Sequence, residues 1–191
     1  MLSCNCLGKS WEQTNMVHPF TIRTATATDA RGIAEVNIRS WRETYPGIMP
    51  ETLLASLSLE SCTRNWDKAL ATGSCVIVAV MDERIVGFVS GGPNRQHEDN
   101  ETGLANSCEC ELATLYLLRS HQKLGIGKAL FEAFVNVMQS LGYITMAVWV
   151  SEQNPATGFY CKMGGELIDR KMYRKANIDI PEVAYRYYID R

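Results

Sequence analysis

The spacing of apolar residues divides the start of the chain into a strand followed by a helix. Residues 20–25 alternate between apolar and polar side chains, as in a half-buried strand. The triplet Thr28-Asp29-Ala30 then gives a helix start signal, and apolar residues recur near helical spacing from 31 to 45. The pair Pro46-Gly47 ends this helix.

The middle of the chain predicts a hairpin and a long loop. Two apolar runs of strand length, 75–80 and 85–90, flank a polar turn at 81–84. Residues 91–107 are rich in Gly, Asn, Asp and Glu without periodicity, which predicts a surface loop long enough to be functional. Ahead of the hairpin we expect a short helix at 50–57 and an amphipathic stretch at 66–71.

Strands and helices alternate in the second half. The expected elements are a strand at 108–117, a helix at 126–141, a strand at 143–150, a helix at 155–163, a strand at 166–170 and a last strand at 183–188. A hairpin followed by such alternation predicts an α/β fold with a mixed sheet flanked by helices. Residues 1–18 lack periodicity and are expected to form a flexible extension, so a single domain spans 19–191.

Composition and charge exclude several classes of partner. Of the 191 residues, 46% are hydrophobic and 21% are charged, as in ordinary globular proteins. The 19 Lys and Arg residues nearly balance 21 Asp and Glu residues, so no overall field attracts nucleic acid or an anionic membrane. No apolar run reaches the ~18 residues of a spanning helix, and the N-terminus does not resemble a signal peptide. We therefore expect a cytoplasmic protein.

The seven cysteines predict reduced thiols rather than disulfides or a metal site. Their number is odd and their spacing irregular, unlike a secreted disulfide framework. The pairs Cys4-x-Cys6 and Cys108-x-Cys110 lack the two-residue gap of common zinc knuckles, so no metal is expected. Cys161 has no His or carboxylate positioned to activate it, and we interpret it as a buried helical cysteine.

The segment Gln122-Lys123-Leu124-Gly125-Ile126-Gly127 joins an apolar strand to a helix of good helix formers. The first amides of a helix have no acceptor within it and the helix dipole is positive at that end, so a phosphate or pyrophosphate can bind there. Gly125 and Gly127 lack the side chains that would block a close approach. The segment is therefore typical of a phosphate-binding turn.

Two common phosphate-binding motifs do not fit this turn. A Walker A loop ending at Gly127-Lys128 would put Gln122 in place of its first Gly and Ala129 in place of its hydroxyl residue. A dinucleotide-binding fingerprint needs a third Gly, which the residues after Gly127 do not supply.

The run from Glu111 to Gly127 resembles the central motif of the GCN5-related N-acetyltransferase (GNAT) family, whose signature is Gln/Arg-x-x-Gly-x-Gly/Ala after a strand. The run from Asn154 to Gly164 resembles the family's Asn-x-x-Ala-x-x-Phe-Tyr-x-x-x-Gly motif. The resemblance covers residues 20 to 170, with Arg119 where the family often has Pro and Gly165 where it often has an aromatic residue. It implies an acyl-CoA N-acyltransferase-like fold with a mostly antiparallel sheet, and acetyl transfer from acetyl-CoA to an amine.

The resemblance also implies the donor site. The end of the central strand would pair with the pantetheine arm of acetyl-CoA through Leu115, Tyr116 and Leu117. Asn154 would contact the cofactor or cap the helix before Pro155, and the two roles are compatible. The residues matching the pyrophosphate cradle are Gln122, Lys123, Leu124, Gly125, Ile126, Gly127 and Lys128.

Acetyl transfer needs a proton acceptor, because an acceptor amine with a pKa of ~10.4 is protonated at neutral pH. Glu109 and Glu111 share one strand face, and the family position favours Glu111, acting through water with a pKa raised by burial. Alternatively, these carboxylates face solvent or pair with a base. Tyr160 occupies the family position of the acid that protonates the CoA thiolate, although the pair Phe159-Tyr160 is also typical of core packing.

The acceptor side is less defined. Segment 40–50 resembles a first-helix segment that helps to cover the acceptor site in many bacterial members. Within it, Trp41 and Tyr45 share one helix face and either line an acceptor pocket or pack in the core. The acceptor is expected to be a small-molecule or peptide amine. The aromatic tail 185–188 either completes the sheet or meets another subunit in a homodimer.

The main alternative to an enzyme is a non-catalytic acyl-CoA-binding or sensor module. Such a module would keep the glycine turn without needing Glu111 or Tyr160. Both residues are present, which favours catalysis. A phosphoryl-transfer enzyme is disfavoured because the Walker hydroxyl is missing.

Overall fold

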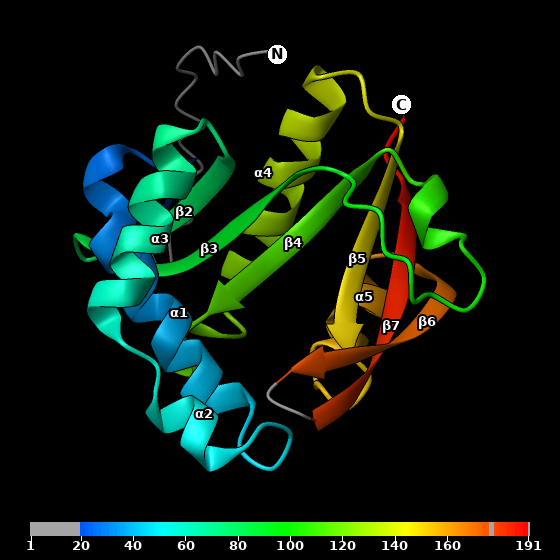
Figure 1. Ribbon diagram of the computed structural model, residues 1–191. Helices are drawn as coiled ribbons and strands as arrows, with labels where there is room; N and C mark the ends of the chain where they lie inside the picture. The colour runs from blue at the N-terminus through cyan, green and yellow to red at the C-terminus, as the bar shows by residue number, and fades with distance from the viewer. Residues whose placement is uncertain (1–19, 176–177, 191) are drawn as a thin grey trace.

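A computed structural model of the chain describes residues 20–175 and 178–190. The expected extension 1–18, with its Cys4-x-Cys6 pair, lies outside them. Within the described residues, seven strands form one sheet in the order β1-β2-β3-β4-β5-β7-β6, in which β4 and β5 alone run parallel (Figure 1). The sheet is mixed, mostly antiparallel and flanked by helices, which confirms the predicted fold class.

The elements follow the predicted order. The strands are β1 Thr21–Thr24, β2 Cys75–Met81, β3 Arg84–Pro93, β4 Cys110–Leu117, β5 Thr145–Ser151, β6 Glu166–Lys175 and β7 Ile178–Tyr188. The helices are α1 Ala30–Thr44, α2 Glu51–Ala55, α3 Leu59–Ala71, α4 Ile126–Ser140 and α5 Thr157–Lys162. Short 3-10 turns are η1 Ala27–Asp29, η2 Ala105–Ser107 and η3 Arg119–His121.

Several boundaries differ from the predicted ones for local reasons. Helix α3 begins before the expected stretch because the Ser58 hydroxyl accepts a hydrogen bond from Ser61 N at 3.4 Å and caps it. Helix α5 is shorter than expected because residues 154–156 form a turn ahead of it. Strands β6 and β7 are longer than expected because they pair with each other as far as Lys175 and Ile178. The aromatic tail therefore completes the sheet, between β5 and β6.

Helices cover both faces of the sheet. Figure 1 shows α4 behind β3 and β4, and a Cβ added to Gly91 of β3 would collide with Phe134 of α4. On the opposite face, Trp66 of α3 packs edge-on against Phe88 of β3 with ring centroids 5.0 Å apart. Helix α1 lies on the same face as α3, against which it packs. The main core thus lies on both faces of the sheet, with Phe134 of α4 on one side and Ile33 and Val36 of α1 on the other.

Strands β4 and β5 diverge in the middle of the sheet (Figure 1). Their described pairs are confined to residues 110–112 and 146–148. A bulge at Ala113 lies beside this point, because Ser90 pairs with Thr114 while Gly91 pairs with Leu112. A bulge adds twist to a strand, and here it turns the end of β4 away from β5. The divergence exposes backbone groups of β4 in the centre of the fold.

Candidate active site

The predicted glycine turn lies beyond the open end of the divergence, where α4 begins. Lys123 and Gly125 adopt positive φ angles of 63° and 83°. The first helical hydrogen bond of α4 is the one that Ala129 N donates to Gly125 O at 3.0 Å, so the amides of residues 126–128 precede it. These amides stand at the positive end of a 15-residue helix, which suits a phosphate oxygen.

The two parts of the predicted donor site come together at this end. A Cβ added to Gly127 would touch the side chains of Leu117 at the end of β4 and Phe159 of α5, both at 3.8 Å. Leu115 and Leu124 are half-buried and pack against the main core. Gln122, Lys123 and Lys128 are exposed around the turn. Segments 115–117 and 122–128 therefore border one site.

The predicted acceptor residues also meet, around Tyr116. Trp41 Nε1 donates a hydrogen bond to the Tyr116 hydroxyl at 2.8 Å, and the Trp41 and Tyr45 rings lie 5.0 Å apart. The Tyr45 hydroxyl interacts with Tyr116 and with Asn154, and burial raises the pKa of Tyr45. The predicted contact of Tyr116 with the donor uses its backbone, while its side chain joins the aromatic group on the α1 face.

Asn154 makes a turn rather than capping α5 directly. Its Oδ1 accepts a hydrogen bond from Ala156 N at 2.9 Å, two residues on, while the cap position of α5 is Ala156 itself. The interpretation of Asn154 as the helix cap is therefore wrong by two residues. Its buried side chain links the start of α5 to Tyr45.

Glu111 is the more buried of the two candidate carboxylates, with 2% of its side chain exposed. Arg95 Nε and Nη2 donate to its two oxygens at 3.1 and 2.5 Å, and Arg95 N adds a bond at 3.3 Å. Burial raises the pKa of Glu111, but these bonds outweigh it, and the pKa is lowered. The expectation of a raised pKa is therefore wrong. Glu109 is exposed and accepts a hydrogen bond from Ile144 N at 2.7 Å.

Tyr160 lies in the core at the start of the last helix, with 5% of its surface exposed. Its ring stacks on Tyr185 at 6.2 Å, and its carbonyl accepts a hydrogen bond from the Tyr187 hydroxyl at 2.8 Å. Burial raises the pKa of Tyr160 far above its ordinary value, and Tyr45 adds to this effect. The phenol therefore keeps its proton across the physiological pH range.

The sequence did not point to a group of charged residues beside Glu111. Arg95 and His97 come from the segment between β3 and β4, Lys171 from β6 and Glu182 from β7. The one sequence feature that pointed to this region was the length of segment 91–107, which ends just before the strand that contains Glu111.

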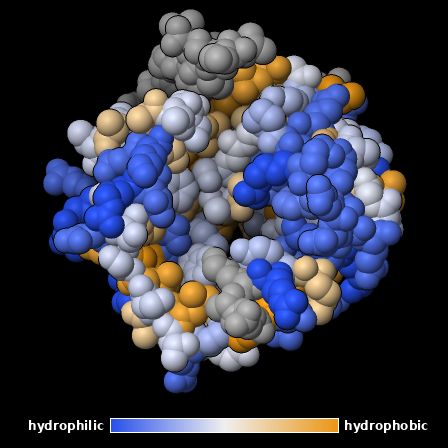
Figure 2. Space-filling model, in the orientation of Figure 1, coloured by the Kyte–Doolittle hydropathy of each residue, from blue (hydrophilic) through white to orange (hydrophobic). Residues whose placement is uncertain are grey.

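A pocket of about 270 Å³ opens beside Glu111. It is lined by Trp66, Ala69, Ser74, Ser90, Gly91, Gly92, Pro93, Arg95, Glu111 and Ala113. Figure 2 shows the surface hollowed near its centre, between the hydrophilic surface of the β3–β4 segment and the surface over α1 and α3. The carboxylate thus borders an open space on the face opposite α4.

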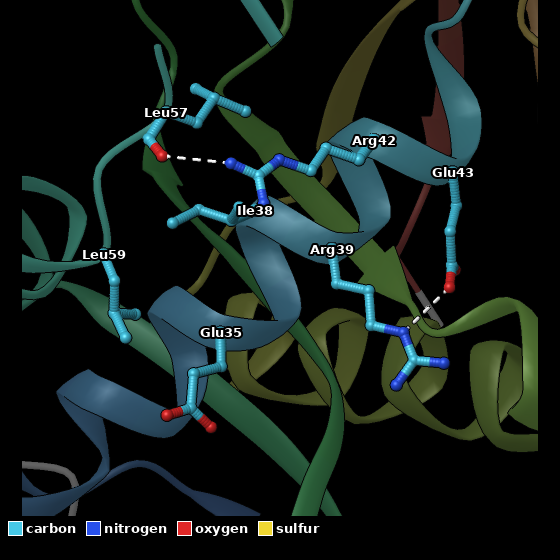
Figure 3. Close-up of a pocket in the computed structure, with 7 residues that line it drawn as sticks. All are labelled: Glu35, Ile38, Arg39, Arg42, Glu43, Leu57 and Leu59. Carbon is cyan, nitrogen blue, oxygen red and sulfur yellow. Dashed lines mark hydrogen bonds and ion pairs between the residues drawn. The ribbon is translucent and has the colours of Figure 1, made fainter. Parts of the chain in front are cut away.

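A larger hollow of about 460 Å³ lies beside α1 and the segment that enters α3 (Figure 3). Its lining residues are Glu35, Ile38, Arg39, Arg42, Glu43, Leu57 and Leu59. Arg39 Nε pairs with Glu43 at 2.9 Å and Arg42 Nη2 donates to the Leu57 carbonyl at 3.3 Å. Its lining includes no residue of β4 or β5 in the described chain, so we do not assign it to the candidate site.

The surroundings of the described cysteines indicate structural roles for them. Cys62, Cys108, Cys110 and Cys161 carry free thiols, and the described residues hold no group of three His, Cys, Asp or Glu side chains that suits a metal. Burial raises the pKa of Cys110 to about 12. Cys161 is exposed on α5 and donates to the Tyr185 hydroxyl at 3.4 Å, so its interpretation as a buried cysteine is wrong. No helix in the described part of the chain is long and apolar enough to cross a membrane.

Comparison with known proteins places this geometry in a family. Residues 34–164 match the Acetyltransferase (GNAT) family. The chain belongs to the GNAT family. The uncharacterized N-acetyltransferase YuaI of Bacillus subtilis (strain 168) is 32% identical to it over 165 residues, which cover 85% of this chain and 90% of YuaI. As the sequence predicted, this GNAT protein is an N-acetyltransferase that uses acetyl-CoA as its acetyl donor and an amine as acceptor.

Solved GNAT structures share the fold. The PaiA N-acetyltransferase of Thermoplasma acidophilum, in complex with coenzyme A, is 21% identical with a TM-score of 0.62, and the match covers 88% of this chain and 99% of that one. The yncA structure from Salmonella typhimurium, with its cofactor acetyl-CoA, is 16% identical with a TM-score of 0.65 and covers 90% of this chain and 94% of that one. The residues around the 122–128 turn of this chain fit such a ligand, because its helix amides precede the first helical bond and a Cβ added to Gly125 would meet nothing within 4 Å.

Proposed function

We propose that this N-acetyltransferase binds both substrates along β4, with the donor at its end and the acceptor beside its start. The observation that carries the proposal is the position of two features on one diverging strand. Glu111 stands on β4 at its last pairs with β5, and the anion-binding turn follows the end of β4. A substrate lying in the divergence would connect the two.

Acetyl-CoA would be bound mainly by backbone groups. The amides of the 122–128 turn would bind the pyrophosphate of acetyl-CoA, and the backbone of 115–117 would pair with its pantetheine arm. Amides of β4 that face the divergence would stabilise the tetrahedral oxyanion. Asn154 supports the donor site by fixing the turn before α5.

The acid and base are proposed from their surroundings. Glu111, through an ordered water, would take the proton of the acceptor amine, because Arg95 keeps it ionised and the adjoining pocket gives water access. Tyr160 would protonate the departing CoA thiolate, because burial keeps its phenol protonated. The amine nitrogen attacks the thioester carbon directly, without an acyl-enzyme, and the C–S bond breaks as the tetrahedral intermediate collapses and releases the thiolate.

The acceptor is proposed to be a small-molecule or peptide amine that enters from the α1 face. Trp41 and Tyr45 would contact its body, since both lie with Tyr116 on that face. A cytoplasmic location belongs to the same proposal, and the free thiols of Cys62, Cys108, Cys110 and Cys161 are consistent with it.

Free-thiol release in the presence of acetyl-CoA and a panel of amines tests the proposal. We expect turnover with at least one amine, and we expect Glu111→Gln to lower kcat by about 10²–10⁴-fold, the usual contribution of a general base. A Glu98→Gln variant, which changes an exposed carboxylate between β3 and β4, is the matched control. Unchanged turnover in Glu111→Gln would remove Glu111 as the base, whatever the acceptor.

A further inference from the structure

The segment between β3 and β4 is fixed at His97 by two asparagines. Asn94 Nδ2 donates to the carbonyl of Ala105 at 2.7 Å, which closes the segment on itself. Asn106 Oδ1 accepts from His97 N at 3.0 Å, and Asn106 Nδ2 donates to His97 O at 2.8 Å. This pair of bonds holds the backbone of His97 from both sides. These hydrogen bonds therefore fix the conformation of the segment and, with it, the position of the His97 imidazole.

That imidazole lies between two charged groups from different strands. Lys171 Nζ of β6 is 3.0 Å from His97 Nδ1, and Glu111 Oε2 of β4 is 3.5 Å from His97 Nε2. An ammonium has only donors, so Nδ1 must accept and the proton of the neutral ring must be on Nε2. The Nε2–H group thus faces the Glu111 carboxylate, at ion-pair distance. Nε2 is buried and has no hydrogen bond within the described residues.

Lys171 is itself fixed in a buried position, with 8% of its surface exposed. Its Nζ lies 3.5 Å from Glu182 Oε2 and 4.1 Å from the centroid of the Trp149 ring. Glu182 of β7 pairs with Lys171 of β6 in the sheet register, so the two side chains share a face. A carboxylate and an aromatic face both stabilise an ammonium, and together they aim Lys171 at His97.

From these contacts we propose that His97 is a positioning residue for acetyl transfer, which orients the Glu111 carboxylate through the electrostatic attraction of Nε2–H at 3.5 Å, and that Lys171 sets the ring tautomer required. The inference rests on the proposed role of Glu111. Arg95 holds the same carboxylate from the other side through two nitrogens. Glu111 would then keep one orientation towards the acceptor throughout the reaction.

The surrounding charges favour a neutral ring. His97 is faced by Arg95 from its own segment, by Glu111 from β4 and by Lys171 from β6, with Glu182 of β7 behind Lys171. Burial lowers the pKa of His97 most, Lys171 and Arg95 lower it further, and Glu111 opposes them. A neutral donor can orient Glu111 without adding a second full positive charge beside the base.

Nitrogen NMR of the imidazoles in the full-length protein tests the tautomer without relying on activity. We expect His97 to carry its proton on Nε2 and to titrate below the ordinary histidine value of ~6.5. Lys171→Met should raise that pKa, because it removes a neighbouring positive charge, and Glu111→Gln should lower it. A proton on Nδ1, or a pKa that Lys171→Met leaves unchanged, would overturn the proposal.

Kinetics test the positioning role. His97→Leu should lower kcat by about tenfold, less than Glu111→Gln, and should move the acidic limb of the kcat/KM profile to higher pH, because a neutral Nε2–H beside the carboxylate favours the ionised form of Glu111. His97→Gln, whose amide can also donate, should restore most of kcat. Glu98→Gln, at the exposed position on the other side of His97, is the control.

The outcomes separate the two proposals. Loss of activity in His97→Leu with an unmoved pH profile, or no rescue by His97→Gln in a variant of equal stability, would overturn the role of His97. Full activity of Glu111→Gln together with the expected NMR result would instead overturn the proposed base, while leaving the tautomer assignment intact.

Discussion

At the scale of single residues, the surroundings shift the pKa values of two buried titratable groups in opposite directions. Glu111 has a lowered pKa because Arg95 outweighs the effect of burial. Tyr160 has a raised pKa because it is buried and because Tyr45 lies nearby. These opposite shifts fix the protonation states at neutral pH, with the carboxylate ionised and the phenol protonated. The carboxylate is ready to accept a proton and the phenol to donate one.

For the phenol, we predict that Tyr160→Phe lowers kcat by about 10²-fold or more across pH 6–9, because the whole range lies below the pKa of the wild-type phenol. Steady-state thiol release at each pH measures this. Tyr185→Phe is the matched control, because Tyr185 stacks on Tyr160 and the substitution removes an equivalent hydroxyl. Equal kcat values for wild type and Tyr160→Phe would show that the thiolate takes its proton elsewhere.

For the carboxylate, we predict a pH-dependent loss of stability in Glu111→Gln. A lowered pKa in the folded state means that Glu111 stabilises the protein above its unfolded pKa and that this contribution is lost as the pH falls through the folded value. We expect the variant to be less stable by about 1–3 kcal/mol at pH 7, the scale of a hydrogen bond to a charged group. The difference should shrink towards pH 3 in urea unfolding, and a constant difference would contradict the assignment.

At the scale of elements, the bulge between β3 and β4 depends on one of two adjacent glycines. A Cβ at Gly91 would collide with the backbone of Glu111 and with Phe134 of α4, whereas a Cβ at Gly92 would meet nothing within 4 Å. The close contact of α4 with this part of the sheet therefore requires a residue without a side chain at position 91. The same glycine sets how closely helix and bulge approach.

We accordingly predict that Gly91→Ala destabilises the protein by about 1–3 kcal/mol or more, as overpacking does, while Gly92→Ala costs much less. Chemical denaturation of both variants measures the difference, and the pair controls for the change in composition. If the two variants unfold at the same midpoint, α4 does not press on the bulge as described.

Local patterns of the sequence predicted the elements, and long-range contacts decided the rest. Helix α1 and the β2–β3 hairpin were predictable because their periodicity and turns lie within the elements themselves. The lowered pKa of Glu111 was not, because Arg95 reaches it from 16 residues away in a segment without periodicity. The contact of His97 with Lys171 spans 74 residues and depends on the register of β6. The spacing of residues within one element cannot predict contacts between segments that lie far apart in the sequence.

At the scale of the whole molecule, the sheet is joined in its middle by only three described residue pairs. One half, β1 to β4, carries α1 and α3, and the other half, β5 to β7, carries the Lys171–Glu182 pair. A ligand in the divergence would contact both halves. Binding the donor is therefore expected to stiffen the centre of the fold.

We predict that acetyl-CoA slows amide hydrogen exchange in residues 114–117 of β4 and 149–151 of β5, which lie beyond the described β4–β5 pairs. At a concentration 100 times its Kd, the ligand should also stabilise the protein by ~2.7 kcal/mol. Exchange mass spectrometry and thermal unfolding measure the two effects. Strand β1, at the far edge of the sheet, should change little. Protection at β1 alone would place the ligand elsewhere.

The backbone character of the 122–128 turn has a consequence for how this protein can change over evolutionary time. The groups proposed to bind the anion are main-chain amides, and Lys123 and Gly125 shape the turn through their left-handed conformations, so most side chains there could change without loss of the donor. The groups that would face an acceptor instead come from α1, the β3–β4 segment and β6–β7. New amine preferences can thus arise by substitution in those elements while the donor platform is inherited unchanged.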